Sequence, residues 1–439
     1  MKLFQNDKPS GTLPWDRAAT RAYISLALCF PLGTTNEKNL KAIFKHIKQS
    51  LAQLAEKRPD FAGRLVREKE SIFLHKSASD EIPFEVLNDV HFIYTYEQLK
   101  RDGFSACAFV NPALLVNADP LIAGKRVPVS QLRLLFIEGR FILLVYLHHS
   151  YTDGRGMDTF LQLLGAETRG VEDVPLEAAN KTDCGLDLGL PEGKQEDATQ
   201  LLAQCPEYKL LSNPVGPTVY DFSQRPGWVA TLKIGKTFLI DLTKLDELRK
   251  STTTTTTNGG GKPPSQFAFL ATLAWAHTTK ARLAADPESD SPAAQPVFCN
   301  PQDWSNPRKG LFAGNPSLQA YFGNAVTIGI TKLPTVQSGA DLVLACDQES
   351  SSYSRIIDIA NAITAANRAV DETFVLTRTA LFTAMGDDIS RLGIALEPWV
   401  PHAFSMNTWE FKGRSARFWF PGGVAASVEG ENQGRRLML

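Results

Sequence analysis

Two adjacent histidines, His148 and His149, end an apolar run over residues 141–147 and are followed by Asp153 and Gly154. An imidazole changes its charge near neutral pH, so it is suited to take a proton from a hydroxyl or an amine. Successive residues of a strand point to opposite faces of the sheet, so only one of the two rings can face a given cleft. The glycine lets another backbone approach closely. The segment therefore predicts a general base at the end of a buried strand.

Other interpretations of this segment are a structural histidine pair and a metal site. In a structural pair, one ring packs in the core and the other is solvated. A metal site needs both rings and Asp153 on one ion, which the opposite directions of the rings make awkward, so we predict no metal. A serine hydrolase would need a G-x-S-x-G elbow, which the sequence lacks. Neither Gly154-Arg155-Gly156 nor Gly261-Lys262-Pro263 completes a nucleotide-binding motif.

Composition places the chain among ordinary globular proteins. It has 439 residues, of which 43% are hydrophobic and 21% charged, and its 46 basic and 47 acidic residues give a net charge of −1. This balance gives no electrostatic argument for binding nucleic acid or an anionic membrane. The amino terminus has no apolar core of a secretory signal, and no apolar run reaches the roughly 18 residues of a membrane span. The six cysteines form no CxxC pair, so we expect reduced thiols and a cytoplasmic protein.

The elements that must position the histidines follow from hydrophobic periodicity. Apolar residues recur at steps of three and four between residues 36 and 57, which predicts an amphipathic helix that ends before Pro59. Residues 132–147 predict a hairpin whose second strand ends on the histidine pair, and helical spacing follows over residues 156–164. An early strand is expected over residues 23–30.

The second half also alternates strands with helices. Between residues 165 and 227 polar and turn residues dominate, which predicts a connection between two domains. The tract Thr252–Thr257 and the glycines after it are predicted to form a mobile surface loop. Strands are expected at residues 238–242, 325–333 and 404–411, and helices at residues 265–283 and within residues 339–367. The alternation indicates an α/β or mixed α+β fold.

Residues 148–154 match the HHxxxDG motif of an acyltransferase superfamily that includes chloramphenicol acetyltransferase, peptide-synthetase condensation domains and the BAHD enzymes. Other segments resemble landmarks of BAHD-type proteins, especially the fungal trichothecene 3-O-acetyltransferase-like ones: Leu13-Pro14-Trp15-Asp16, residues 59–66, the helix at 265–282, and Tyr321-Phe322-Gly323-Asn324. The resemblance implies two chloramphenicol-acetyltransferase-like domains of mixed α/β structure with a channel between them. It places the N-terminal domain at residues 1–180, a crossover connection at 181–225 and the C-terminal domain at 226–439.

In the family that the chain resembles, the second histidine of the motif is the general base, which maps to His149. It would take the proton of an acceptor hydroxyl as that oxygen attacks an acyl thioester, without a covalent acyl-enzyme. His148 would turn away and pack. Asp153, which precedes Gly154, would support the site structurally through a buried ion pair with an arginine shortly before the YFGN motif, for which Arg308 is the nearest candidate.

Further site residues are implied by the same resemblance. Asn407 or Thr408 would donate to the oxyanion of the tetrahedral intermediate, because Asn407-Thr408-Trp409 resembles the family's segment there; a polar pair on an edge strand is the alternative. Lys262 and Ser265 lie near the place where relatives contact the nucleotide end of coenzyme A, and a solvated loop is the alternative. The family's DFGWG motif does not follow Trp409, which puts the packing behind the site in question.

The predicted function is transfer of an acyl group, expected to be acetyl, from coenzyme A to a hydroxyl or amine of a small secondary metabolite. Acyl-CoA is then a co-substrate, and no cofactor is expected to be bound permanently. The expected partners are these small molecules alone, and the protein is expected to be a monomer. Two alternatives stay open: a condensation-type enzyme that takes its acyl group from a carrier protein, and a homologue that binds a product or guides a cyclisation without acyl transfer. The YFGN motif favours the BAHD side over the condensation type.

Overall fold

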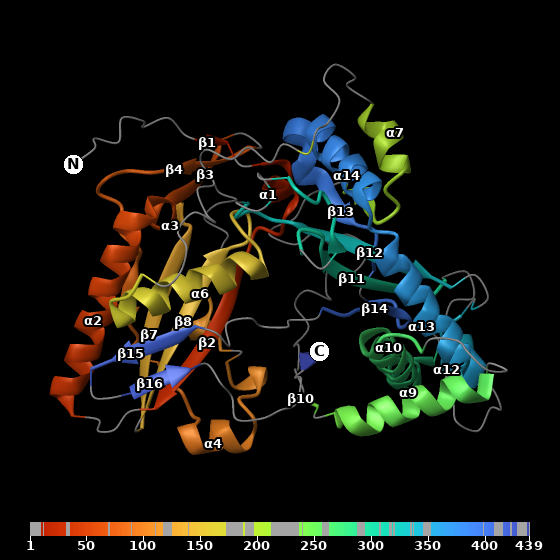
Figure 1. Ribbon diagram of the computed structural model, residues 1–439, viewed down its shortest axis with the longest axis horizontal. Helices are drawn as coiled ribbons and strands as arrows, with labels where there is room; N and C mark the ends of the chain where they lie inside the picture. Colours follow the sequence, from red (N-terminus) through yellow and green to blue (C-terminus); the bar gives the residue numbers. More distant parts are fainter. Residues whose placement is uncertain are drawn as a thin grey trace.

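The computed structural model has two lobes that lie side by side (Figure 1). Helices and strands alternate in both lobes, which confirms the predicted mixed α/β class. No helix in the described part of the chain is long and apolar enough to cross a membrane. The structure describes residues 10–11, 13–31, 36–68, 71–88, 90–109, 111–116, 125–138, 140–172, 188, 197–211, 237–238, 240–256, 263–287, 295–306, 309–315, 318, 321–333, 336, 338–345, 353–397, 399–407, 416–421, 424–427 and 437–438.

The first lobe is built on a four-stranded sheet in the order β2-β8-β7-β5. Its central pair is the predicted hairpin, in which β7 (Ser130–Ile137) and β8 (Arg140–His148) run antiparallel. β2 (Tyr23–Pro31) pairs antiparallel with the other edge of β8, and β5 (Phe84–Val86) lies parallel to β7. β8 therefore has a hydrogen-bonded partner on both edges, which fixes the register of the histidine at its end.

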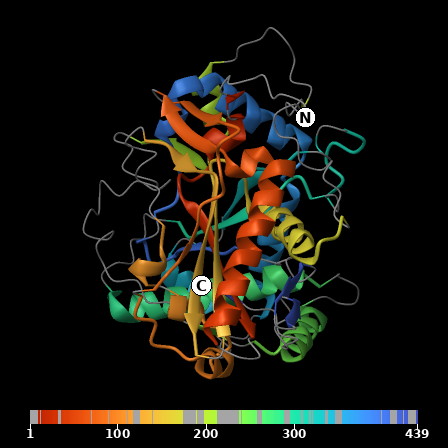
Figure 2. The same ribbon diagram turned by 90° about the vertical axis from the view of Figure 1, so that its left-hand side faces the viewer.

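Helices cover both faces of this sheet. α2 (Glu37–Lys57) and α6 (Gly154–Arg169) pack on one face, and Figure 2 shows α2 crossing in front of the strands. α4 (Tyr96–Arg101) lies on the opposite face. Residues 141–147 of β8 are apolar because alternate residues enter two separate cores, one on each face. These residues are Phe141, Leu143, Val145 and Leu147 on the α2 side, and Ile142, Leu144 and Tyr146 on the α4 side.

A second, smaller sheet of the first lobe has the order β1-β4-β3-β6, with every pair antiparallel. The helical turns α1 and α3 each begin with a proline, whose missing N–H costs nothing at that position. Pro59, predicted to end α2, is thus the first residue of α3. The elements are β1 (Ser10–Gly11), α1 (Pro14–Ala18), α3 (Pro59–Ala62), β3 (Arg64–Glu68), β4 (Ser71–His75), β6 (Val127–Pro128) and the 3-10 turns Ala106–Phe109 and Pro112–Leu114.

The second lobe has a three-stranded sheet in the order β12-β11-β14. β11 (Val297–Asp303) pairs antiparallel with β12 (Val326–Lys332) and parallel with β14 (Ala403–Ser405). Helices pack against this sheet through a buried cluster centred on Trp275 and Phe298. These helices are α9 (Leu242–Thr256), α10 (Gln266–Ala285), α12 (Gly339–Ala345) and α13 (Tyr353–Arg368). The predicted helical region within residues 339–367 therefore contains two helices.

Further elements of the second lobe gather around α14 (Glu372–Met385). α7 (Ala198–Ala203) packs against α14, and β9 (Tyr208–Leu210) pairs antiparallel with β13 (Leu392–Ile394). A 3-10 turn at Gly386–Arg391 joins α14 to β13. α7 and β9 come from the segment predicted to be a connection, so part of that segment is ordinary structure of the second lobe.

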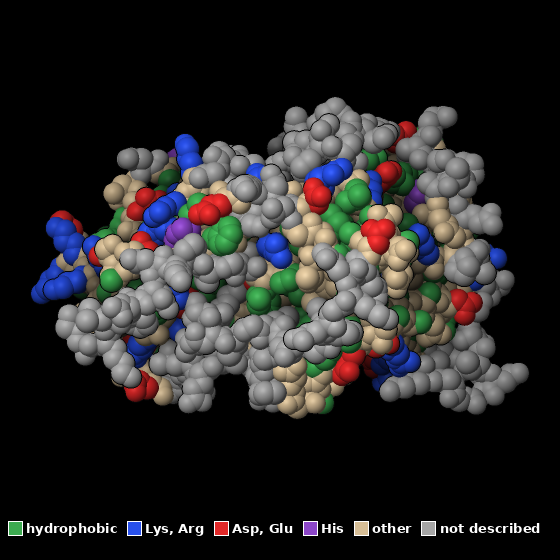
Figure 3. All heavy atoms as spheres, turned by 90° about the horizontal axis from the view of Figure 1, so that it is seen from above, with side chains coloured by type: hydrophobic (Ala, Val, Ile, Leu, Met, Phe, Trp, Pro, Cys, Tyr) green, Lys and Arg blue, Asp and Glu red, His purple; other side chains and the backbone are tan. Residues whose placement is uncertain are grey.

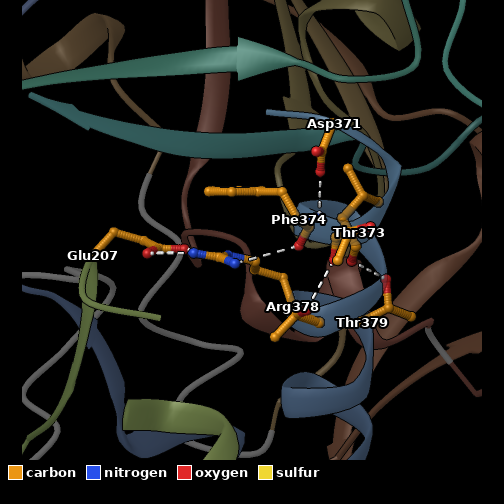
Figure 4. Close-up of polar contacts among 8 residues, drawn as sticks. Glu207, Asp371, Thr373, Phe374, Arg378 and Thr379 are labelled. Carbon is orange, nitrogen blue, oxygen red and sulfur yellow. Dashed lines mark hydrogen bonds and ion pairs between the residues drawn. The ribbon is translucent and has the colours of Figure 1, made fainter. Parts of the chain in front are cut away.

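A buried ion pair ties this segment to α14 (Figure 4). The guanidinium of Arg378 donates to both carboxylate oxygens of Glu207, at 2.6 and 2.9 Å. It also lies 3.4 Å from the ring centroid of Phe374, and both charged side chains are buried. Removing one partner from such a pair leaves a buried charge uncompensated, which is much costlier than losing an exposed pair.

The chain returns to the first lobe near its end. β15 (Arg417–Phe420) and β16 (Val424–Ser427) form an antiparallel hairpin against α6 and β2. The rings of Phe418 and Phe420 lie 5.4 and 5.0 Å from that of Phe30 and belong to the core of the first lobe. Side chains of β15 therefore complete the core to which β2 also contributes.

The contact between α6 and β15 is close. A Cβ atom at Gly165 would lie 2.6 Å from the carbonyl oxygen of Arg417, so α6 needs a glycine there. On the same side of α6, the Thr168 hydroxyl accepts from the N–H of Trp419 at 3.3 Å, and Arg169 donates to the Arg417 carbonyl at 3.0 Å.

Two predictions for the second half are wrong. The strand expected at residues 238–242 is only β10 (Thr237–Phe238), which pairs with β17 (Leu437–Met438), and the threonine tract through Thr256 is the end of α9 rather than a loop. Asp241 starts this helix, because its carboxylate accepts from the backbone N–H of Thr243 at 2.9 Å. A helix that has been nucleated extends readily into residues of moderate propensity.

Candidate active site

The ring of His148 points into the first lobe. It is fully buried, its Nδ1 accepts a hydrogen bond from the N–H of Ser150 at 3.1 Å, and it packs edge-on against Tyr23 at 4.9 Å between ring centroids. Burial, together with the neighbouring charges of His149 and Arg21, lowers the pKa of His148 to about 3. A neutral, enclosed ring of this kind is suited to packing rather than to proton transfer.

The next residue, His149, faces the second lobe. Its backbone N–H donates to the carbonyl of Ala22 at 2.7 Å, which anchors it beside β2. Its ring Nδ1 lies 2.9 Å from Oδ1 of Asn324, which precedes β12, and its side chain is half-buried. This ring therefore sits where the two lobes meet, as strand alternation requires for the neighbour of His148.

The hydrogen bonds of Asn324 determine which nitrogen of His149 carries the proton. The side-chain N–H groups of Asn324 donate to Oδ1 of Asp16 at 2.9 Å and to the carbonyl of His149 at 2.7 Å. Because both partners only accept, the amide oxygen must be the atom that faces the ring, and Nδ1 of His149 must be the donor. The neutral ring then has its lone pair on Nε2. This is the form of imidazole that can accept a proton from a substrate.

Asp153 is held by backbone amides. Its Oδ1 accepts from the N–H of Arg155 at 2.9 Å and of Gly156 at 3.3 Å, which makes it the N-cap of α6. Its Oδ2 accepts from the N–H of Ala325 at 2.9 Å, across the contact between the lobes. Burial raises the pKa of Asp153, and Asp303 nearby raises it further, whereas the amide hydrogen bonds oppose the shift.

The ion pair expected at Asp153 stays a prediction, because its nearest candidate partner is not among the residues that the structure describes. No arginine or lysine among the described residues forms a salt bridge with it, and Arg308 lies outside them. A carboxylate can be stabilised in a buried position by several N–H donors and the positive end of a helix. The donors seen for Asp153 come from the turn into α6 and from the start of β12.

The start of β12 is held between two carboxylates. The backbone N–H of Asn324 donates to Oδ1 of Asp16 at 2.9 Å, and the next N–H, of Ala325, donates to Asp153. Nearby, Arg155 of α6 donates to the side chain of Ser305 at 2.9 Å, and the Ser305 hydroxyl donates to Asp303 at 2.7 Å. Polar contacts thus cross from the histidine segment to both strand ends of the second lobe.

An apolar contact reinforces this junction. Phe322 comes from the second lobe but belongs to the core of the first, where its ring lies 5.4 Å from that of Phe61 and 5.8 Å from that of Tyr151. The Tyr151 hydroxyl donates to Asp60, which is also paired with the buried Arg58. The two lobes therefore interlock directly behind the histidine segment.

The other predicted site residues lie apart from this network. Gly154 is the first residue of α6, next to the cap. Ser265 is the N-cap of α10, where its hydroxyl accepts from the N–H of Ala268 at 3.1 Å, so its side chain has a structural use there. Asn407 is exposed just beyond β14, apart from the hydrogen bonds described above for His149. Thr408 and Lys262 lie outside the described residues.

Sequence reasoning missed the roles of Asn324 and Asp16. Both belong to segments that resemble family landmarks, Tyr321–Asn324 and Leu13–Asp16, but nothing local in either segment indicates contact with a histidine. The feature that could have identified these two residues is an amide or a carboxylate side chain next to buried aromatic residues. A polar side chain in such a place needs a partner.

Charged side chains of both signs lie on the face of the molecule drawn in Figure 3. On the face drawn in Figure 3, Lys and Arg side chains are interspersed with Asp and Glu side chains. Among the described residues, no group of three or more His, Cys, Asp or Glu could hold a metal ion.

The sequence of the first lobe is related to known acyltransferases. Residues 22–167 match the family described as the trichothecene 3-O-acetyltransferase-like N-terminal domain. Acyltransferase cm3D of Cordyceps militaris is 26% identical over 170 residues, which are 35% of this chain and 34% of that protein. Eremophilane O-acetyltransferase prx11 of Penicillium rubens is 27% identical over 177 residues, 37% of this chain and 36% of that protein. The chain matches these curated relatives over about a third of their length.

Solved structures share the fold over nearly the whole chain. TRI101 of F. sporotrichioides, crystallised with coenzyme A and T-2, aligns with a TM-score of 0.65 and 17% identity, over 99% of this chain and 89% of that one. Vinorine synthase aligns with a TM-score of 0.56 and 17% identity, over 100% of this chain and 91% of that one. Together with the match over residues 22–167, this confirms the predicted resemblance and the two-domain fold.

Proposed function

We propose that this chain, whose residues 22–167 match a trichothecene 3-O-acetyltransferase-like N-terminal domain, transfers an acyl group from coenzyme A to a hydroxyl of a small acceptor. The observation that carries the proposal is the hydrogen bond of 2.9 Å between Nδ1 of His149 and Oδ1 of Asn324. It leaves the lone pair of the ring on Nε2, at the contact between the lobes. Such a nitrogen is what an alcohol needs to become a nucleophile near neutral pH.

The reaction follows from this geometry without a covalent acyl-enzyme. Nε2 of His149 takes the hydroxyl proton as the acceptor oxygen attacks the thioester carbonyl carbon. The imidazolium that forms keeps its Nδ1–H bond to Asn324, whose amide oxygen favours the positive charge. When the tetrahedral intermediate collapses, the C–S bond breaks, and the proton on Nε2 passes to the departing thiolate. The base is thereby restored.

The other assigned roles belong to the same proposal. Asp153 and Gly154 shape the turn that presents His149, and Asn407 or Thr408 donates to the oxyanion. Lys262 and Ser265 contact coenzyme A, which is a co-substrate rather than a resident cofactor. The domains are taken as residues 1–180 and 226–439, joined by 181–225, in a monomeric cytoplasmic enzyme.

The acceptor is proposed to be a hydroxylated secondary metabolite and the acyl group to be acetyl. Support comes from the relatives: TRI101 of F. graminearum has been crystallised with coenzyme A and deoxynivalenol, and prx11 is named an eremophilane O-acetyltransferase. An amine acceptor would use the same base.

The test is release of free thiol from acetyl-CoA in the presence of a panel of hydroxylated sesquiterpenoids that includes deoxynivalenol. We expect acceptor-dependent release by the native chain and a fall of about 10²–10⁴-fold for His149→Ala. His277→Ala, an exposed position on α10, is the matched control and should keep the native rate. Equal rates for His149→Ala and the native chain would contradict the assignment of the base. Acceptor binding without thiol release would favour a homologue that does not transfer acyl groups.

A further inference from the structure

Asp16 is a buried carboxylate outside the histidine motif. It lies in α1, a single turn with no exposed surface at this side chain. Its neighbour Trp15 fixes the turn to the second lobe by donating to the Thr379 hydroxyl at 2.9 Å and by packing edge-on against Phe382 at 4.9 Å. The position of Asp16 is thus determined by packing that is independent of the histidine segment.

The same oxygen of Asp16 accepts twice from one residue. Oδ1 lies 2.9 Å from the backbone nitrogen of Asn324 and 2.9 Å from its side-chain nitrogen. The two contacts fix both the backbone and the amide plane of Asn324. A carboxylate has no proton to donate here, so only the NH₂ group of Asn324 can face it.

We propose that Asp16 is a positioning residue for His149, acting through Asn324 to select the imidazole tautomer that can serve as a base. The proposal rests on the proposed acyl transfer. Without the carboxylate, the amide orientation of Asn324 depends on its contacts with His149 alone, which are the bond to the His149 carbonyl at 2.7 Å and the bond to Nδ1 at 2.9 Å. Its amide can then turn over and present NH₂ to Nδ1, and this arrangement favours the ring with its proton on Nε2. A ring in that form cannot accept the proton of an alcohol.

The consequence is a chain of three side chains in which each one fixes the next. Asp16 orients Asn324, Asn324 orients the proton of His149, and His149 has its Nε2 lone pair available. The residues are 308 and 175 positions apart along the chain, so three separate segments must be folded together before the tautomer is determined. In functional histidines generally, the hydrogen bond made by one ring nitrogen determines which of the two nitrogens carries the proton.

The experiment measures the tautomer directly by ¹⁵N NMR of the full chain labelled at its seven histidines, with His149 assigned from a His149→Gln sample. In the native protein, at a pH where the ring is neutral, we expect His149 to carry its proton on Nδ1. Asp16→Ala should shift the ring toward the Nε2–H form and lower kcat about 10-fold or more. Asp16→Asn keeps one acceptor oxygen for Asn324 and should restore most of the native tautomer and rate.

Trp15→Phe is the matched control. It removes the hydrogen bond to Thr379 from the same helical turn but leaves Asp16 in place, so we expect a lower Tm with an unchanged tautomer. A native His149 with its proton on Nε2 would overturn the proposal even if Asp16→Ala did not fold. So would a folded Asp16→Ala with the native tautomer, or a Trp15→Phe that shifts the ring as much as Asp16→Ala. Loss of thiol release in every sample, native included, would instead contradict the acyl transfer, because the NMR measurement needs no turnover.

Discussion

Two neighbouring histidines at the end of β8 lie in opposite environments. On the first-lobe side, His148 is enclosed, meets Tyr23 edge-on and has its pKa lowered to about 3. On the side where the lobes meet, His149 is half-buried and bonded to an amide oxygen of Asn324. The difference teaches that neighbouring residues of one motif can serve stability and chemistry separately, because a strand sends them to opposite faces.

The role of His149, on the side where the lobes meet, is tested by Asn324→Ala. We expect kcat for thiol release to fall about 100-fold, because His149 loses the partner that fixes its proton on Nδ1. The measurement is a double-mutant cycle with His149→Ala. If Asn324 acts through the ring, adding Asn324→Ala to His149→Ala should cost little more. If the kcat losses of Asn324→Ala and His149→Ala are additive, Asn324 does not act through the ring, and the contrast drawn between the two histidines is wrong.

The burial of His148, on the first-lobe side, is tested through the pH dependence of the free energy of unfolding. The folded-state pKa of His148, about 3, lies below the unfolded value near 6.5, so the unfolded chain binds the extra proton between these values. The stability that the neutral ring provides is present above pH 6.5 and is lost as the pH falls, by about 1.4 kcal/mol per unit. Between pH 7 and 5, the free energy of unfolding of the native chain should fall about 2 kcal/mol more than that of His148→Gln.

Urea unfolding at several pH values measures this difference, and glutamine keeps an acceptor for the Ser150 N–H. His277→Gln, at an exposed position of α10, controls for the loss of one imidazole and should follow the native curve. If His148→Gln loses stability in parallel with the native chain, the ring is not held neutral by burial.

The turn after the histidines should show a smaller effect. In Asp153→Asn the side-chain oxygen can still cap α6, but its NH₂ would meet the N–H of Ala325. We expect a loss of about 1–2 kcal/mol in the free energy of unfolding, the cost of one unsatisfied buried amide. Denaturant titration measures it, and Asp197→Asn, at the exposed N-cap of α7, is the control. An equal loss in both variants would indicate a capping effect alone.

The smallest effect is expected at Gly156. A Cβ atom there would overlap the Thr152 hydroxyl oxygen and lie 3.1 Å from the ring of Phe322, so Gly156→Ala crowds the junction. Crowding costs about 1–3 kcal/mol, whereas alanine gains about 1 kcal/mol of helix propensity. The net result should be a loss of about 1 kcal/mol, and the double variant with Thr152→Ala, which removes the hydroxyl oxygen, measures whether the contact is the cause. A more stable Gly156→Ala would show that Thr152 moves aside freely.

Much of the fold could be predicted from the sequence because its signals are local. The apolar run of β8, the three- and four-residue steps of α2 and the Ser265 cap of α10 each lie within one element. The threonine tract is helical against the expectation from its composition, because a cap at Asp241, well before the tract, starts the helix that contains it. Local rules fail where an earlier residue decides the structure of a later one.

Only part of the site could be predicted, because the partners of the motif residues come from distant segments. His149 and Asp153 share a seven-residue motif, but the partners of both are brought in from the second lobe and from α1. The ion pair expected at Asp153 stays a prediction, and the donors described for this carboxylate are backbone amides, which carry no sequence signal. Side-chain identity shows what chemistry is available, and tertiary packing decides which groups meet.

The return of the β15–β16 hairpin to the first lobe has a consequence for the order of assembly during translation. Phe418 and Phe420 fill the core around Phe30 and Phe141, yet they are synthesised long after both of these residues. Until then the strand that carries the histidines lacks part of its apolar cover, and contacts of such long sequence separation form slowly. A nascent chain truncated before residue 416 would therefore expose these rings and depend on chaperones. The core beneath the strand that leads to the base is therefore completed only after the second lobe has been synthesised.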